Sequence, residues 1–207
     1  MYKKIFYIFI IISSTLKADD WPSWFGPERD GVWREEGVVF KFPQNRPKSI
    51  WKTPVGRGYA GPAVADGKVY IMDRQIDKGA KSPENPFSKI TIPGNERLLC
   101  LDAKNGEIFW EKSYDCPYSI SYSAGPRTTP LIDENRVYTI GAEGNLYCRR
   151  TSDGKEIWST DFNTAFNVKT PTWGFSSTPL IYENLLICLA GGEGTVAVAF
   201  NKSNGIE

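Results

Sequence analysis

Aromatic side chains and one arginine occur together in two polar stretches of the sequence, and they are the residues most suited to binding. Three tyrosines are spaced by four residues and precede an arginine, and a tryptophan and a phenylalanine occupy the matching stretch further along. Aromatic rings beside a guanidinium suit a planar or carbohydrate-like ligand or a protein partner. The alternative is that the rings pack between structural elements and hold the loops down. The candidate ligand- or partner-binding residues are Tyr114, Tyr118, Tyr122, Arg127, Trp173 and Phe175.

The composition argues against several catalytic classes. The chain has no histidine, which excludes a Ser-His-Asp triad, a Cys-His dyad and a His-ligated zinc site within it. A hydrolase or zinc enzyme would need unusual substitutes, and we predict no catalytic residue and no metal ligand. The 25 basic and 24 acidic residues give a net charge of +1, so no basic field for nucleic acid is present.

The four cysteines are predicted to be buried thiols rather than disulfides. Cys100 and Cys148 occupy the same position of successive repeats, and Cys188 lies on a different predicted strand. Equivalent positions of neighbouring repeats are too far apart for disulfide geometry, although an exported chain would permit disulfides.

A repeat of about 50 residues organises the chain. Residues 100–110 (CLDAKNGEIFW) and 148–158 (CRRTSDGKEIW) share the spacing of a glycine and a tryptophan, and residues 199–207 begin a third copy. The glycines at 106, 154 and 205 give periods of 48 and 51 residues. In the second copy we expect strands at 129–132, 136–140, 145–149 and 156–160, separated by turns rich in Gly, Asn and Asp.

Four short strands for each repeat predict an all-β fold, a β-propeller of four-stranded antiparallel blades. Residues 49–53 resemble the last strand of a preceding blade, and residues 178–207 supply three strands of the final one. This makes about three blades, fewer than the usual number of roughly 4 to 8, so we expect a partial fragment of a larger ring.

The predicted connections differ in length at the two ends of the blades. Residues 74–96, 113–127 and 161–176 are long connections that emerge at one end, whereas short turns occupy the other. Long loops on a rigid scaffold commonly carry binding sites, so we expect a partner to bind the long-loop face.

The N-terminus has the pattern of a signal peptide at residues 1–18. Lys3 and Lys4 precede an apolar run at residues 5–12, which is shorter than the roughly 20 residues that a membrane anchor needs. We predict an extended segment at 19–48, propeller blades at 49–207, no transmembrane segment in the mature chain, and a periplasmic or secreted location.

The repeat resembles the tryptophan-docking motif of the PQQ-like, or quinoprotein-type, β-propeller family (PQQ is pyrroloquinoline quinone). The motif has a small residue, then Asp, Gly and Trp at fixed spacing, although Arg150 replaces the Asp in the second copy, and residues 20–31 also resemble the start of such proteins. Tryptophans that recur at the blade period indicate packing between blades. The residues predicted to dock the blades are Trp51, Asp102, Gly106, Trp110, Gly154, Trp158 and Gly205.

The resemblance implies one of two functions. Quinoprotein dehydrogenases bind PQQ and calcium and oxidise alcohols or sugars, whereas other members, including the outer-membrane-protein assembly lipoprotein, are binding scaffolds without a cofactor. The dehydrogenases typically have a vicinal cysteine pair, and this chain has none. We therefore predict a non-catalytic scaffold, without cofactor, for a protein or polysaccharide partner. The alternative is a PQQ-dependent oxidoreductase whose cofactor site lies partly in missing blades.

Overall fold

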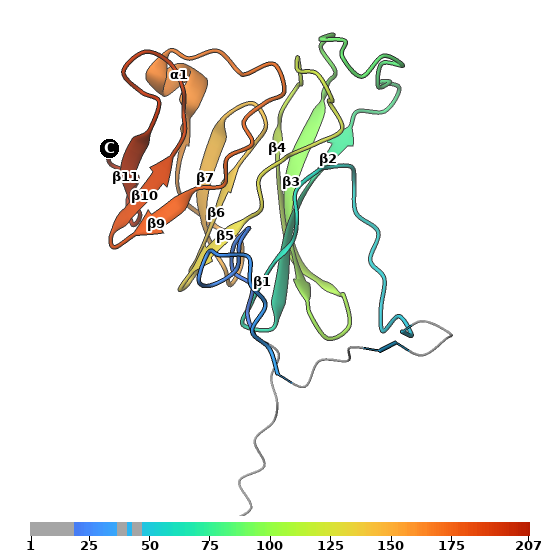
Figure 1. Cartoon of the computed structure of the whole chain (residues 1–207). Coiled ribbons are helices and arrows are strands. Elements are labelled where there is room, and N and C mark those ends of the chain that lie inside the picture. The colour runs from blue at the N-terminus through green and yellow to red at the C-terminus, as the bar shows by residue number, and fades with distance from the viewer. Residues whose placement is uncertain (1–18, 37–40, 43–46) are drawn as a thin grey trace, which may run out of the picture.

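The computed structural model describes residues 19–36, 41–42 and 47–207, so the predicted signal peptide lies outside the described residues. Three antiparallel sheets stand side by side in chain order (Figure 1). The first contains β1 (Ala63–Ala65), β2 (Lys68–Ile76), β3 (Gly94–Asp102) and β4 (Ile108–Asp115). The second contains β5 (Leu131–Asp133), β6 (Arg136–Ile140), β7 (Asn145–Arg150) and β8 (Glu156–Asp161). The third contains β9 (Leu180–Tyr182), β10 (Leu185–Cys188) and β11 (Val198–Asn201).

Each sheet is a meander in which sequential strands pair, and the first two sheets repeat one register. Cys100 pairs with Trp110 in the first, Cys148 pairs with Trp158 in the second, and an irregularity follows each cysteine. The predicted strands of the second repeat are confirmed to within two residues. The structure therefore confirms the prediction of four-stranded antiparallel blades in a partial propeller.

The hydrophobic core lies between the sheets rather than within one layer. Tyr70 and Met72 of β2 pack against Val137 of β6 in a cluster that joins the first and second sheets. A larger cluster joins the second sheet to the third through Trp158, Phe162 and Phe200, among others. Face-to-face burial of this kind makes each blade depend on its neighbour for stability.

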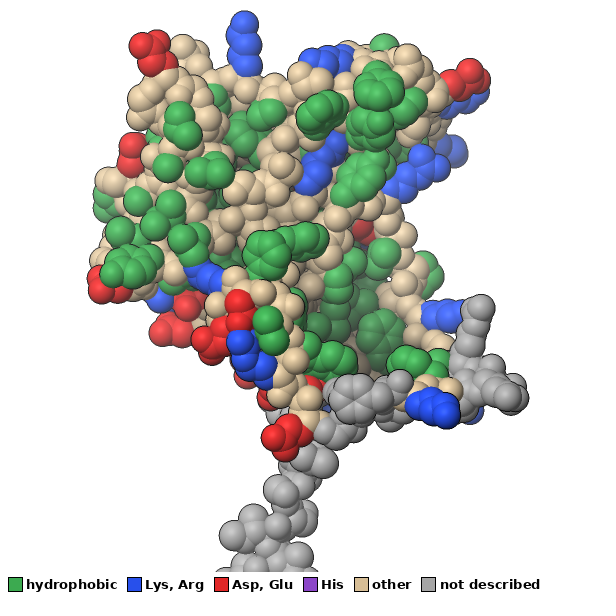
Figure 2. Space-filling view, viewed as in Figure 1, with side chains coloured by type: hydrophobic (Ala, Val, Ile, Leu, Met, Phe, Trp, Pro, Cys, Tyr) green, Lys and Arg blue, Asp and Glu red, His purple; other side chains and the backbone are tan. Residues whose placement is uncertain are grey.

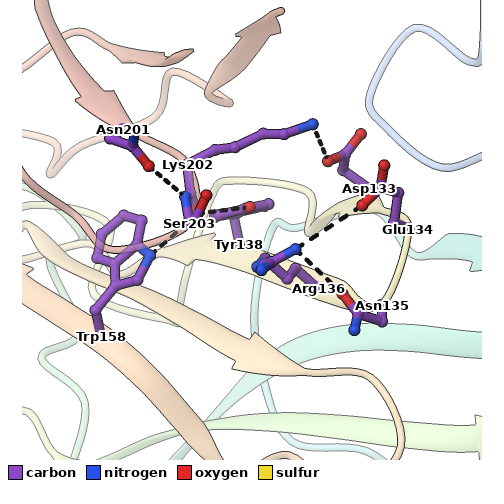
Figure 3. Close-up of polar contacts among 9 residues, drawn as sticks. All are labelled: Asp133, Glu134, Asn135, Arg136, Tyr138, Trp158, Asn201, Lys202 and Ser203. Carbon is purple, nitrogen blue, oxygen red and sulfur yellow. Dashed lines mark hydrogen bonds and ion pairs between the residues drawn. The ribbon is translucent and has the colours of Figure 1, made fainter. Parts of the chain in front are cut away.

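A tryptophan docks each blade onto the turn of the next through one repeated contact. The indole Nε1 atoms of Trp51, Trp110 and Trp158 donate hydrogen bonds of 3.0, 3.1 and 3.1 Å to the carbonyls of Ala103, Thr151 and Lys202. Figure 3 shows the third contact, where the Lys202 carbonyl also accepts from the Tyr138 hydroxyl at 2.9 Å. The Lys202 ammonium adds an ion pair of 2.7 Å with Asp133.

The repeated glycine lies directly beneath each indole. Gly106, Gly154 and Gly205 have φ values of 75°, 70° and 74°, a conformation that glycine adopts without strain. A Cβ atom at these positions would lie 2.5, 2.7 and 2.7 Å from a ring atom of the docked tryptophan. Glycine is therefore required by both the backbone conformation and the packing. Asp102 accepts a 2.7 Å hydrogen bond from the Lys104 amide in the first of these turns.

Two details of the fold differ from the sequence expectation. Residues 49–53 do not form a strand, although Trp51 docks as predicted. A strand needs a hydrogen-bonded neighbour, and no preceding strand exists among the described residues to supply one. The loop after β8 contains a short helix, α1 (Phe162–Phe166), which was not expected. The carboxylate of Asp161 caps it by accepting a hydrogen bond from the Thr164 amide at 2.8 Å.

Long connections gather at one end of the blades, as predicted, and short turns occupy the other (Figure 1). The first long connection is shorter than expected, at residues 77–93, because β2 and β3 extend beyond their predicted ends. We call this end the loop face. Residues 19–30 run along the inner strands, where Trp21 forms a bridge with Val64 and the Ile132 amide donates to the Pro22 carbonyl at 2.8 Å.

All four cysteines are free and buried, which confirms the expectation of buried thiols. Burial raises the pKa of Cys100 and of Cys148 to about 11, so the reactive thiolate is scarce near neutral pH. We expect iodoacetamide at pH 8 to label none of them in the native chain and all four after denaturation without reductant, as counted by mass spectrometry. Fewer than four labels in the denatured chain would reveal a disulfide.

Among the described residues, no helix is long and apolar enough to span a membrane.

Candidate binding site on the loop face

Backbone and side-chain hydrogen bonds join the long loops to one another, so the loop face is held in one arrangement. The connection at 77–93 pairs with the following loop through a bridge between Ile92 and Tyr118. That loop in turn contacts the one after α1, because the Ser121 amide donates to the Thr172 carbonyl at 2.9 Å. Lys89 spans the same gap, with its ammonium 3.0 Å from the Thr172 hydroxyl. A preorganised surface of this kind loses little entropy on binding.

A buried carboxylate lies beneath these loops. Glu96 of β3 is fully buried and accepts hydrogen bonds from the hydroxyls of Tyr114 and Tyr118. It also accepts from the Ala142 amide of the second sheet at 2.9 Å. The guanidinium of Arg74 lies over the Tyr118 ring, 3.9 Å from its centroid. Burial raises the pKa of the Glu96 carboxyl, and the hydrogen bonds oppose that rise.

Three of the six candidate binding residues point inward. Tyr114 and Tyr118 hold Glu96, and Tyr118 is fully buried. Phe175 is 5% exposed and packs edge-on against Phe162, with ring centroids 5.4 Å apart. Tyr118 and Phe175 are thus buried, and Tyr114 is partly buried with its hydroxyl directed to Glu96. They fasten the loops to the blades, which is the alternative that the sequence left open for the aromatic residues.

The other three candidates come together at the surface. Tyr122, Arg127 and Trp173 line one crevice of about 250 Å³, together with Tyr59 and Ser176. Trp173 is 61% exposed and Tyr122 is 39% exposed, so both rings are available to a partner. Figure 2 shows apolar side chains lying among Lys and Arg side chains at this end of the molecule. We call this hollow the Arg127 crevice.

Tyr59 and Ser176 are not among the predicted binding residues, although the repeat contains a signal for them. Tyr59, Arg127 and Ser176 each stand three residues before the proline that opens the first strand region of a blade. They are therefore equivalent positions of successive blades. Equivalent positions at the inner strands of a propeller converge toward the central axis, which brings the three side chains to one crevice.

Arg127 is fixed by backbone carbonyls rather than by an acid. Its guanidinium donates to the carbonyls of Gly125, Ser121 and Tyr122, at 3.0 Å for Ser121, and lies 5.2 Å from the centroid of the Tyr59 ring. Among the described residues, no carboxylate lies within ion-pair distance of it. Burial lowers the pKa of Arg127, so its positive charge is only partly compensated within the chain.

A second hollow of about 410 Å³ adjoins the crevice and shares Arg127 and Ser176 with it. The N-terminal segment contributes one wall through Trp24, Phe25 and Arg29. The start of the third blade contributes the opposite wall, with hydroxyl groups followed by apolar side chains. The remaining lining residues of the second hollow are Ser23, Ser177, Thr178, Pro179 and Leu180.

A quinoprotein site would hold calcium, for which acidic side chains are common ligands. No group of three or more Asp, Glu, Cys or His side chains comes together in the described part of the chain to ligate a metal. Calcium needs 6 to 8 oxygen ligands, as a general rule. The Arg127 crevice offers a guanidinium, hydroxyls and aromatic rings.

The stacked four-stranded sheets and the repeated tryptophan contacts define a β-propeller built from PQQ-like repeats. A family model described as outer membrane protein assembly factor BamB matches residues 94–207. The chain belongs to this family of PQQ-like repeat propellers.

Relatives of known function share parts of the chain. An outer membrane protein assembly factor BamB of Nitrosomonas eutropha is 27% identical over 80 residues, which is 37% of this chain and 19% of that protein. A tetrathionate hydrolase of Acidithiobacillus ferrooxidans is 25% identical over 158 residues, 69% of this chain and 29% of that protein. The chain thus spans less than a third of the length of these relatives.

Solved structures show the same fold. The quinohemoprotein alcohol dehydrogenase of Comamonas testosteroni superposes with a TM-score of 0.56 at 18% identity, covering 90% of this chain and 26% of that one. At this identity the likeness supports the propeller architecture alone.

Proposed function

We propose that this chain is part of an exported, non-catalytic propeller that binds a protein partner at its loop face. The observation that carries the proposal is the Arg127 crevice, where exposed aromatic side chains surround a fixed arginine. Exposed Trp and Tyr beside an Arg are the residue types that dominate binding energy at protein interfaces. The family match supports a role in assembly at the cell envelope, and the predicted signal peptide supports a periplasmic location.

Site-specific photo-crosslinking tests this proposal. A photoreactive amino acid at Trp173 places the probe on the loop face, and the same amino acid at Lys104 places it in a short turn at the opposite end. In cells of the source organism we expect a discrete protein adduct from position 173 and none from position 104. Adducts of equal yield from both positions, or from 104 alone, would contradict a partner on the loop face.

A polysaccharide is the alternative partner, because an exposed tryptophan such as Trp173 can stack on a sugar ring. Binding to a glycan array that is lost in Trp173→Ala, with no protein adduct from position 173, would favour this alternative.

The dehydrogenase alternative requires PQQ and calcium, for which the described residues supply no metal-ligand cluster. Dye reduction with alcohols after addition of PQQ and calcium to the full-length protein would overturn the scaffold proposal.

A further inference from the structure

Arg127 forms no ion pair among the described residues, in contrast to several arginines of the sheets. Arg97, Arg149 and Arg150 each form an ion pair with a carboxylate, at 2.7 Å for Arg97 and Asp73. Arg127 has only carbonyl partners among the described residues, and these carbonyls hold its guanidinium against the wall of the crevice. A fixed, partly desolvated cation without an anion is a recognition element that favours a carboxylate ligand.

The shape of the site suits an extended chain. The two hollows hold about 250 and 410 Å³ and adjoin one another, because they share Arg127 and Ser176. Their walls combine apolar side chains, such as Trp173 and Leu180, with hydroxyl side chains, such as Ser176 and Thr178. Hydroxyls can bond the backbone of a bound peptide, and the apolar surfaces can accept its side chains.

We propose that the Arg127 crevice and the adjoining hollow bind an extended peptide segment of a partner protein, in which a carboxylate side chain stands next to an aromatic or aliphatic one. The carboxylate bonds to Arg127, and the neighbouring apolar side chain packs on Trp173. This inference rests on the proposed function and specifies the chemistry of the partner. Arg29, in the same hollow, adds a second positive charge that favours an acidic segment.

Fluorescence anisotropy with labelled decapeptides tests the inference. Each peptide contains Glu or Asp beside Phe, Leu or Ile on a Gly-Ser background, and each has a matched version with Gln or Asn. We expect the acidic peptides of at least one pair to bind the native chain at least tenfold more tightly than their amide versions. Arg127→Gln should abolish this difference, whereas Arg127→Lys should retain part of it because the charge remains.

Two further variants control for loss of structure. Arg57→Gln removes an arginine whose side chain contacts Ser82 outside the crevice, and it should keep the tenfold preference. Trp173→Ala removes an exposed ring. It should weaken the binding of acidic peptides at least fivefold without lowering the melting temperature of the protein. The inference fails if no peptide binds at millimolar concentration, if acidic and amide peptides bind equally, or if Arg127→Gln keeps the preference. A crosslinked adduct at position 173 that persists in Arg127→Gln would leave the proposed function standing and remove this inference.

Discussion

Replacing Glu96 with alanine is expected to destabilise the chain by at least about 3 kcal/mol, because three buried hydrogen-bond donors lose their acceptor. The two tyrosine hydroxyls and the Ala142 amide would lose their acceptor in a buried site, where an unpaired donor costs about 1 to 3 kcal/mol. The hydrogen bond to Ala142 joins two blades, because Glu96 lies in the first sheet and Ala142 follows β6 of the second. Its loss therefore weakens the contact between these blades. Chemical denaturation followed by circular dichroism measures the change.

Glu96→Gln separates the charge of this residue from its hydrogen bonds. The amide keeps one oxygen for Tyr118 and Ala142, and its nitrogen can donate to the Tyr114 hydroxyl, so we expect a loss below about 1.5 kcal/mol at neutral pH. Destabilisation equal to that of Glu96→Ala would show that the charge, rather than the hydrogen-bond geometry, fastens the blades.

The difference in unfolding free energy between the native chain and Glu96→Gln depends on pH, and the direction of the pKa shift gives the sign of this dependence. Burial raises the pKa of Glu96 in the folded chain, so the folded state binds a proton over a pH range in which the unfolded state has lost it. The contribution of Glu96 to stability is complete below the unfolded pKa of about 4.3 and declines as pH rises through the folded value. The native-minus-variant difference in unfolding free energy should therefore fall as pH rises from 4. A flat or rising difference would contradict the shift.

The repeat was predictable because each blade specifies its strands locally. Turns such as Ser152-Asp153-Gly154 and the alternation of apolar residues set the hairpins, and the spacing from Gly154 to Trp158 repeats once per blade. Residues 49–53 carry the same local signal but form no strand. The docking of Trp51 depends on its own side chain and a turn that follows it, whereas strand formation depends on a neighbour that local sequence does not provide.

Only part of the binding site was predictable, because the contacts that orient its side chains come from residues distant in the sequence. Nothing in the local sequence distinguishes Glu96 from a solvent-exposed charged residue of a strand. Its hydrogen-bond partners are 18, 22 and 46 residues away in the sequence. The spacing of Tyr114, Tyr118 and Tyr122 suggested one cluster, but the chain turns between them, with Tyr122 at a φ of 53°. The first two therefore point to Glu96 and the third to the surface. Aligning the positions before each blade's proline would have identified Tyr59, because convergence at the axis is a property of the ring.

Trp158→Ala is expected to cost about 3 to 5 kcal/mol, the range for truncating a buried tryptophan. The indole is 8% exposed, and its ring lies 6.1 Å from that of Tyr138 and 6.0 Å from that of Phe200, measured between centroids. Truncation removes this packing, opens a cavity above Gly205 and deletes the bond to the Lys202 carbonyl. Because the contact joins the second and third sheets, amide hydrogen exchange should accelerate most in β10 and β11.

Trp173→Ala provides the matched comparison for this effect, since it removes the same side chain from an exposed position. Its cost should stay within about 0.5 kcal/mol, as for surface substitutions that break no contact. The stability loss of Trp158→Phe should lie between those of Trp158→Ala and Trp173→Ala. A phenyl ring keeps part of the packing, and Tyr138 still donates to the Lys202 carbonyl. Equal stability losses for the alanine variants at 158 and 173 would mean that the repeated tryptophan does not hold the blades together. The blade stacking would then depend on the aliphatic and aromatic residues of the sheet faces alone.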